Sequence, residues 1–211
     1  MAPPKLYTRK DSGNCYKVRL LAALLGIELE FIELDRLLND QQHSPDFLAI
    51  NPRGQIPVLV HGEKTFTDSA AILVYLAGSR SDPGTTETPS SFWSNDVAEQ
   101  AAIVDWLAFA SSWIQTGVAL ARFIVIFKGV STLSEPALAK ATTKGIKSLE
   151  ILQTKLRANE WLALGRPTIA DVAVFAYVAL APMGNISLDP YPAVKSWISR
   201  VRSLPGFIPI D

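Results

Sequence analysis

The hydrophobic pattern of this 211-residue chain changes once along its length, and that change constrains the fold more than any other feature. Over roughly the first 80 residues, short apolar runs with strand-like alternation are separated by segments with helical spacing. After a Ser-, Thr- and Pro-rich stretch at residues 79–91, the alternation disappears and only helical segments follow. The sequence therefore predicts an α/β domain over residues 1–80, a linker over 81–91 and an all-α domain over 92–211.

The first domain is expected to contain a strand, a helix and a strand, followed by two strands and a second helix. The apolar spacing places the strands at residues 5–8, 30–34, 56–60 and 64–67, and the helices at 15–25 and 68–78. A polar loop is expected before the third strand. Gly26 and Gly78 are suited to end the two helices.

The second domain is expected to consist of four helical stretches, at residues 93–128, 136–159, 168–181 and 192–204. Gly117 is a candidate break in the first of them. The third stretch is nearly all apolar, which predicts a helix buried on every side. Thr168 and Asp171 have the spacing of a capping box at its start.

Charge and cysteine content exclude several functional classes. The chain has 20 basic residues (Lys plus Arg) and 20 acidic residues (Asp plus Glu), so there is no excess of positive charge to favour binding to nucleic acid. A single cysteine cannot form an internal disulfide. The longest charge-free runs, 106–121 and 172–188, are shorter than the ~20 apolar residues of a membrane span. We expect a soluble, cytoplasmic protein with no nucleic-acid or membrane partner, and no metal site because His43 and His61 match no ligand spacing.

Four motifs in a fixed order carry a family resemblance: SGNCYKVRL at residues 12–20, NPRGQIPVL at 51–59, DSAAI at 68–72 and RPTIAD at 166–171. With them, essentially the whole chain resembles the cytosolic glutathione S-transferase family. The first motif is most similar to the serine-type and asparagine-containing classes (theta, nu and Ure2p-like). The resemblance implies a thioredoxin-like amino-terminal domain, an all-helical carboxy-terminal domain and glutathione as co-substrate.

The resemblance assigns catalysis to Ser12 and Asn14. A hydroxyl and an amide at a helix amino terminus can stabilise a thiolate by hydrogen bonding and through the helix dipole. Alternatively, both residues only form the turn and cap that their types favour. Cys15 lies on the apolar face of the expected helix, which predicts a packing role, while Ser12 occupies the exposed position.

The resemblance also assigns the glutathione-binding residues. A cis Ile56–Pro57 bond would present the Ile56 backbone to the cysteinyl unit of glutathione, and Gln55 would contact the glycine carboxylate. Asp68 and Ser69 would bind the γ-glutamyl group at a helix amino terminus, although they would equally form an ordinary cap. His43 is a further candidate for the glycine carboxylate, or else a solvated loop residue.

Arg9, Phe109, Trp113 and Phe123 are the candidates for binding a small apolar electrophile, since aromatic walls suit such acceptors. Each aromatic residue could instead belong to the core. The sequence F-A-S-S-W at 109–113 departs from nearer relatives, in which an acidic residue and a glutamine are expected, so it does not name the electrophile.

The favoured function is a glutathione transferase, with a role in detoxification or specialised metabolism and assembly as a homodimer implied by the resemblance. Two alternatives stay open. One is a glutathione-dependent thiol–disulfide reductase or isomerase, and the other is a non-catalytic glutathione-binding protein.

Overall fold

The computed structural model describes residues 2–35, 41–79 and 92–210. The chain divides into two compact units, of which the first contains residues 1–90 together with 205–211 and the second contains residues 91–204. The linker predicted at 81–91 lies outside the described residues. The two units are described separately below.

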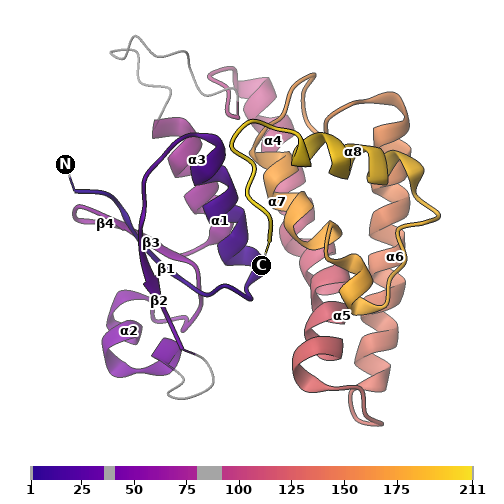
Figure 1. Ribbon diagram of the computed structural model, residues 1–211, viewed down its shortest axis with the longest axis horizontal. Coiled ribbons are helices and arrows are strands. Elements are labelled where there is room, and N and C mark those ends of the chain that lie inside the picture. The colour runs from indigo at the N-terminus through magenta and orange to yellow at the C-terminus, as the bar shows by residue number, and fades with distance from the viewer. Residues whose placement is uncertain (1, 36–40, 80–91, 211) are drawn as a thin grey trace. The chain divides into compact units, whose positions relative to one another are not determined.

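A four-stranded mixed sheet forms the centre of the first unit (Figure 1). Its strands are β1 (Lys5–Thr8), β2 (Glu30–Glu33), β3 (Val58–His61) and β4 (Lys64–Phe66), in the order β2-β1-β3-β4. β1 runs parallel to β2 and antiparallel to β3, and β3 is antiparallel to β4. The third strand begins at Val58 rather than at 56, since Pro57 has no N–H to donate to a ladder.

Helices cover both faces of this sheet. α2 (Pro45–Ile50) places Phe47 against Tyr7, with 5.7 Å between their ring centroids, in a cluster that includes Val58. α1 (Gly13–Leu24) and α3 (Ser69–Ser79) pack against each other on the opposite face (Figure 1). Side chains alternate between the two faces along a strand, so the fully buried Leu6 points toward this face and its neighbour Tyr7 toward α2. This arrangement confirms the thioredoxin-like fold.

The segment expected to be a polar loop contains two short helices, η1 (Gln41–His43) and α2. Ser44 caps α2 by accepting a hydrogen bond from the Phe47 N–H at 3.3 Å, and Pro45 occupies the first turn. Serine followed by proline is a common helix start, so the sequence carried a signal that the polar composition obscured.

Residues 205–211 belong to the first unit, whereas the sequence placed them with the helical domain. The hydroxyl of the buried Tyr16 donates a 2.7 Å hydrogen bond to the Ile208 carbonyl. Gly206 has φ +81°, and a Cβ there would lie 2.8 Å from the Ala23 carbonyl oxygen. Glycine therefore permits both the backbone conformation and the close approach.

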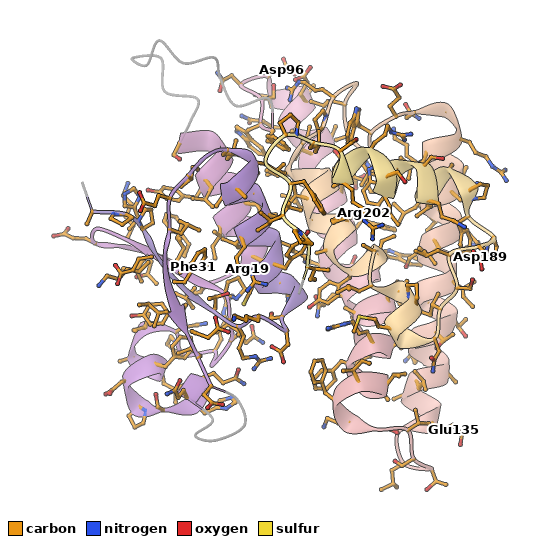
Figure 2. The ribbon with its side chains drawn as sticks, viewed as in Figure 1. Arg19, Phe31, Asp96, Glu135, Asp189 and Arg202 are labelled. Atoms are coloured by element: carbon orange, nitrogen blue, oxygen red, sulfur yellow. The ribbon has the colours of Figure 1, made fainter. Side chains whose placement is uncertain are left out.

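The second unit is all helical. It contains α4 (Val97–Phe109), the π-helical η2 (Ala110–Ala119), α5 (Leu120–Phe123), the π-helical η3 (Ile124–Lys128), α6 (Glu135–Ala158), α7 (Ile169–Val178), the 3₁₀ turn η4 (Ala181–Gly184) and α8 (Pro192–Arg202). Asp96 caps α4 by accepting from the Glu99 N–H at 2.9 Å (Figure 2). Every residue of α7 is buried, as the apolar run predicted.

The first long helix of this unit has no break at Gly117. A Cβ at Gly117 would lie 2.8 Å from the Gly145 nitrogen of α6, so this glycine allows a close approach of two helices. The helix spans 32 residues, Val97–Lys128, and is long and apolar enough to cross a membrane by length and composition. Its most apolar window is 44% buried, and η2 packs on α6 and α7, so a core helix meets the same criterion.

Candidate active site

Ser12 is the N-cap of α1. Its Oγ accepts a hydrogen bond from the Cys15 N–H at 3.3 Å, and its extended backbone (φ −89°, ψ 116°) is typical of a cap. Accepting this bond leaves the hydroxyl hydrogen available for an acceptor. The first turn of α1 contains no acidic side chain that would compensate the positive end of its dipole. This end of α1 is therefore suited to an anion.

Cys15 is fully buried on α1. Burial raises the pKa of its thiol, an effect that outweighs the lowering by the Ser12 hydroxyl. A reactive cysteine needs a low pKa and access to solvent, and Cys15 has neither. Its surroundings agree with the packing role expected from the helical face.

Asn14 is half-buried and is held by a residue that the sequence analysis did not identify. The Lys17 ammonium donates a 2.8 Å hydrogen bond to Asn14 Oδ1. Lys17 is only 4% exposed, and burial lowers its pKa to about 8, although Asp68 opposes that shift. A lysine buried on the same helix as Ser12 was not evident in the sequence because i, i+3 spacing alone does not indicate burial.

The loop before β3 contains the cis Ile56–Pro57 bond that the resemblance predicted. Asn51, which is 1% exposed, donates from Nδ2 to the Gln55 carbonyl at 2.7 Å and accepts from the Arg53 N–H at 3.1 Å. Asn51 thus fixes the loop that presents Gln55 and Ile56. The sequence analysis quoted this residue in a motif but gave it no role.

His43 lies against the same loop. A Cβ at Gly54 would be 2.8 Å from His43 Cδ2, and Gly54 has φ +59°. Only glycine combines that backbone conformation with room for the imidazole ring. The structure therefore places His43 against Gly54, the residue before Gln55.

Strand pairing places the Ser12 turn and the cis-proline loop at the same end of the two central strands, β1 and β3. β1 and β3 are antiparallel and Tyr7 is opposite Val58, so the end of β1 that leads to Ser12 lies beside the start of β3. Asp68, at the start of α3, interacts electrostatically with Lys17 and accepts from the Ala70 N–H at 2.8 Å. Ser69 is the first residue of α3. These contacts gather the predicted glutathione residues on the first unit.

The candidates for the electrophile are divided between the units. Arg9 belongs to the first unit, where its Nε contacts Asp11 Oδ1 at 2.7 Å and its Nη1 contacts Gln42 Oε1 at 3.3 Å. In the second unit, Phe109 and Trp113 stack with their centroids 6.1 Å apart.

The three aromatic candidates of the helix Val97–Lys128 are half-buried rather than core residues: Phe109, Trp113 and Phe123. The Lys144 ammonium lies 5.2 Å from the centroid of the Trp113 ring. Phe123 packs on Phe127 at 5.7 Å, with the Lys128 ammonium 5.9 Å from the Phe123 centroid. Partly open aromatic faces are available in the second unit, as a site for apolar molecules requires.

Comparison with known proteins identifies the family. The model described as "Glutathione S-transferase, N-terminal domain" matches residues 6–84, and that described as "Glutathione S-transferase, C-terminal domain" matches residues 117–205. The chain belongs to the glutathione S-transferase family. The resemblance of the four motifs is thereby confirmed.

Individual members of the glutathione S-transferase family are similar over nearly the whole chain. Glutathione S-transferase Z1 of Arabidopsis thaliana is 31% identical, over 96% of this chain and 89% of the relative. The disulfide-bond oxidoreductase YfcG of Escherichia coli is 28% identical, over 92% and 87%. The crystal structure of a glutathione S-transferase from Pseudomonas fluorescens superposes with a TM-score of 0.90 at 31% identity, covering 99% of both chains.

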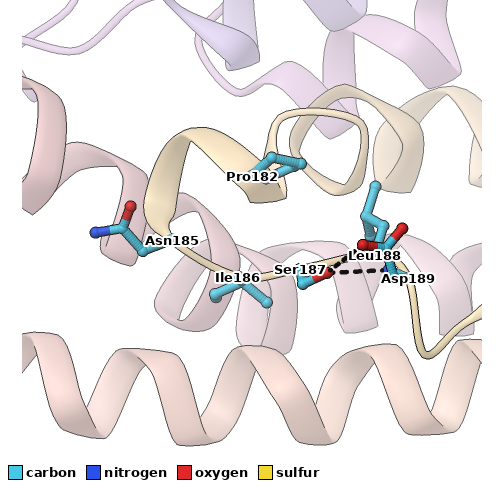
Figure 3. Close-up of a pocket in the computed structure, with 6 residues that line it drawn as sticks. All are labelled: Pro182, Asn185, Ile186, Ser187, Leu188 and Asp189. Atoms are coloured by element: carbon cyan, nitrogen blue, oxygen red, sulfur yellow. Dashed lines mark hydrogen bonds between the residues drawn. The ribbon is translucent and has the colours of Figure 1, made fainter.

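One open pocket of ≈ 470 Å³ lies elsewhere in the chain, at η4 and the connection from η4 to α8 (Figure 3). It is lined by residues of a single connection, among which Ser187 Oγ contacts Asp189 Oδ2 at 3.3 Å. None of the predicted site residues lines it. Within residues 2–35, 41–79 and 92–210, no group of three or more His, Cys, Asp or Glu side chains could hold a metal ion.

Proposed function

We propose that this family member is a glutathione transferase in which Ser12 stabilises the thiolate of bound glutathione. The observation that carries the proposal is that the Ser12 hydroxyl caps α1 while the first turn of this helix has no acidic side chain. Hydrogen bonding and the helix dipole both favour the charged form of a sulfur bound there. Asn14 is proposed to donate from its amide to the same sulfur.

The remaining glutathione contacts follow the shape of the tripeptide. The Ile56 backbone would pair with the cysteinyl unit, next to Pro57. Gln55, with His43 beside it, would bind the glycine carboxylate. The γ-glutamyl group has both a carboxylate and an ammonium, which the Ser69 end of α3 and the Asp68 carboxylate respectively suit.

The chemistry needs no group beyond the two substrates. The thiol proton leaves to solvent, and the thiolate forms a carbon–sulfur bond with the electrophilic carbon. In a displacement, the bond to a leaving group breaks and the leaving group departs with that electron pair. In an addition, the π bond of the electrophile breaks, its electron pair moves to the atom at the far end, and that atom then takes a proton from solvent. Phe109, Trp113, Phe123 and Arg9 are proposed to bind the apolar electrophile. We further propose that the protein acts as a cytoplasmic homodimer, in keeping with a family that is generally soluble.

A second function, glutathione-dependent disulfide reduction, is favoured by the similarity to the E. coli oxidoreductase. Cys15 could not serve as its attacking thiol, because it is fully buried and burial raises its pKa. Any such reaction would therefore use glutathione for every thiol–disulfide exchange step.

Calorimetry with glutathione, followed by turnover of a panel of electrophiles and mixed disulfides, tests these functions. We expect micromolar-to-millimolar binding and conjugation of at least one electrophile, with both retained in Cys15→Ser. Turnover of disulfides alone would favour the reductase. Binding without any turnover would favour the non-catalytic protein, and absence of binding would contradict all three.

A further inference from the structure

Lys17 is the least expected residue of the first unit. It is a cation with 4% exposure on a helix whose amino terminus is positive, so both desolvation and the helix dipole oppose its charge. Burial accordingly lowers its pKa to about 8. A lysine held at such a cost to stability needs an explanation that packing alone does not supply.

The contact with Asn14 gives the first part of that explanation. An ammonium can only donate, so the group that faces Lys17 at 2.8 Å must be the carbonyl oxygen of the Asn14 amide. The amide NH₂ is then directed away from Lys17. Asn14 is the second residue of α1, two positions after the Ser12 cap, so this amide belongs to the turn at the proposed thiolate site.

The interaction with Asp68 gives the second part. Lys17 attracts the Asp68 carboxylate, which is anchored to α3 through the Ala70 N–H. One buried cation therefore contacts the proposed thiolate helper on α1 and attracts the proposed ammonium acceptor at the start of α3. Its own positive charge also adds to the potential that favours an anion at Ser12.

We propose that Lys17 is a positioning residue for glutathione: its ammonium orients the Asn14 amide toward the thiolate. This inference rests on the proposed function and adds to it a residue that does not itself touch the tripeptide.

Replacement of Lys17 by methionine, which is similar in length and uncharged, separates positioning from structural support. Lys17→Met removes a buried charge and leaves no other charge buried without its partner, because Asn14 is neutral and Asp68 is exposed, so the variant should unfold at the same temperature as wild type or higher. Bound glutathione should nevertheless hold about tenfold less thiolate at a fixed pH below its thiol pKa, measured by ultraviolet titration. Lys64→Met, at an exposed lysine of β4, is the matched control and should change neither property.

A double-mutant cycle tests whether Lys17 acts through Asn14. In an Asn14→Ala background, Lys17→Met should cause only a small further loss of thiolate. With Asn14 in place, Lys17→Arg keeps a positive charge and should retain most of the wild-type thiolate fraction. In wild type, the Asn14 side-chain NH₂ signals in the NMR spectrum should shift on glutathione binding, which needs no variant.

The proposal is overturned if folded Lys17→Met has the same thiolate fraction as wild type, or if the effects of Lys17→Met and Asn14→Ala are additive. It is equally overturned if the Asn14 NH₂ signals do not shift when glutathione binds. It is also overturned if Lys17→Met unfolds, since Lys17 would then be structural. These results differ from failure of the proposed function, in which wild type itself would bind no glutathione or leave its thiol pKa unchanged.

Discussion

The amino termini of α1 and α7 both present backbone N–H groups that have no partner within the helix, and the side chains around the two termini differ in the charge that they supply there. At α7, Thr168 caps the helix and Asp171, which is 1% exposed, supplies a carboxylate from within the first turn. Its oxygens accept from the Leu162 and Thr168 N–H groups at 3.1 and 3.0 Å and from Trp197 Nε1 at 2.9 Å. Burial raises the pKa of Asp171, and these hydrogen bonds oppose the rise by favouring the charged form, so the chain itself supplies a carboxyl group at the positive end of this helix.

At α1, Ser12 makes the same kind of cap, but no carboxylate follows it. The charge buried beneath this end is the cation of Lys17 rather than an anion. One terminus thus has a carboxyl group from its own first turn, and the other has none, in keeping with the anion site proposed there. The comparison teaches that the sign of the charge supplied by the first two turns, more than the cap itself, distinguishes a structural helix start from a proposed binding one.

Removal of the α7 carboxylate should have the largest effect on stability. Asp171→Ala leaves three buried N–H donors without their acceptor, at about 1 kcal/mol or more each, so we expect a loss of about 3–5 kcal/mol. Urea unfolding measures this loss. Asp171→Asn keeps one carbonyl acceptor and should lose less. An Asp171→Ala protein as stable as wild type would contradict the structural assignment of this terminus.

The buried Lys17 should make stability depend on pH in a known direction. Its pKa falls from 10.5 to about 8 on folding, so between these values the unfolded chain holds a proton that the folded chain has released. The stability of wild type relative to Lys17→Met should therefore rise by up to about 3 kcal/mol from pH 8 to 10.5. Denaturant unfolding of both proteins without glutathione at several pH values measures the gap. A gap independent of pH would show that Lys17 is not buried as a cation.

Giving α1 the acid that α7 possesses should convert one kind of terminus partly into the other. Asn14→Asp places a carboxylate in the first turn, beside the Lys17 ammonium, and should stabilise the protein by about 0.3–1 kcal/mol. The same carboxylate repels a thiolate, so the thiol pKa of bound glutathione should rise by about one unit. Thermal unfolding should show the gain in stability, and ultraviolet titration should show the loss of thiolate. A variant that is less stable than wild type, or that holds as much thiolate as wild type, would contradict this account of the α1 terminus.

Much of both termini was predictable because their signals are local. The capping box of Thr168 and Asp171 and the position of Ser12 before a helical face follow from spacing over a few residues. The cis Ile56–Pro57 bond was predictable only from the family resemblance, because such bonds are a small minority.

The remainder depends on contacts between segments distant in sequence. Lys17 reads as an ordinary helical lysine until packing buries it near Asp68. Gly117 suggested a helix break, but its contact with Gly145 of α6 shows a packing role. Similarly, no local pattern shows that the Tyr16 hydroxyl binds the Ile208 carbonyl, which is 192 residues away.

Two matched serine caps allow the most direct test of the central claim. Ser12 and Ser44 each accept from an N–H three residues on at 3.3 Å, but the first turn of α2 contains Asp46 and that of α1 contains no acid. Ultraviolet titration of bound glutathione should show a thiol pKa about 1–2 units higher in Ser12→Ala than in wild type, and no change in Ser44→Ala. Each variant should lose a similar ~0.5–2 kcal/mol of stability. Equal thiol pKa values in the two variants would contradict the assignment of Ser12 as the residue that stabilises the thiolate.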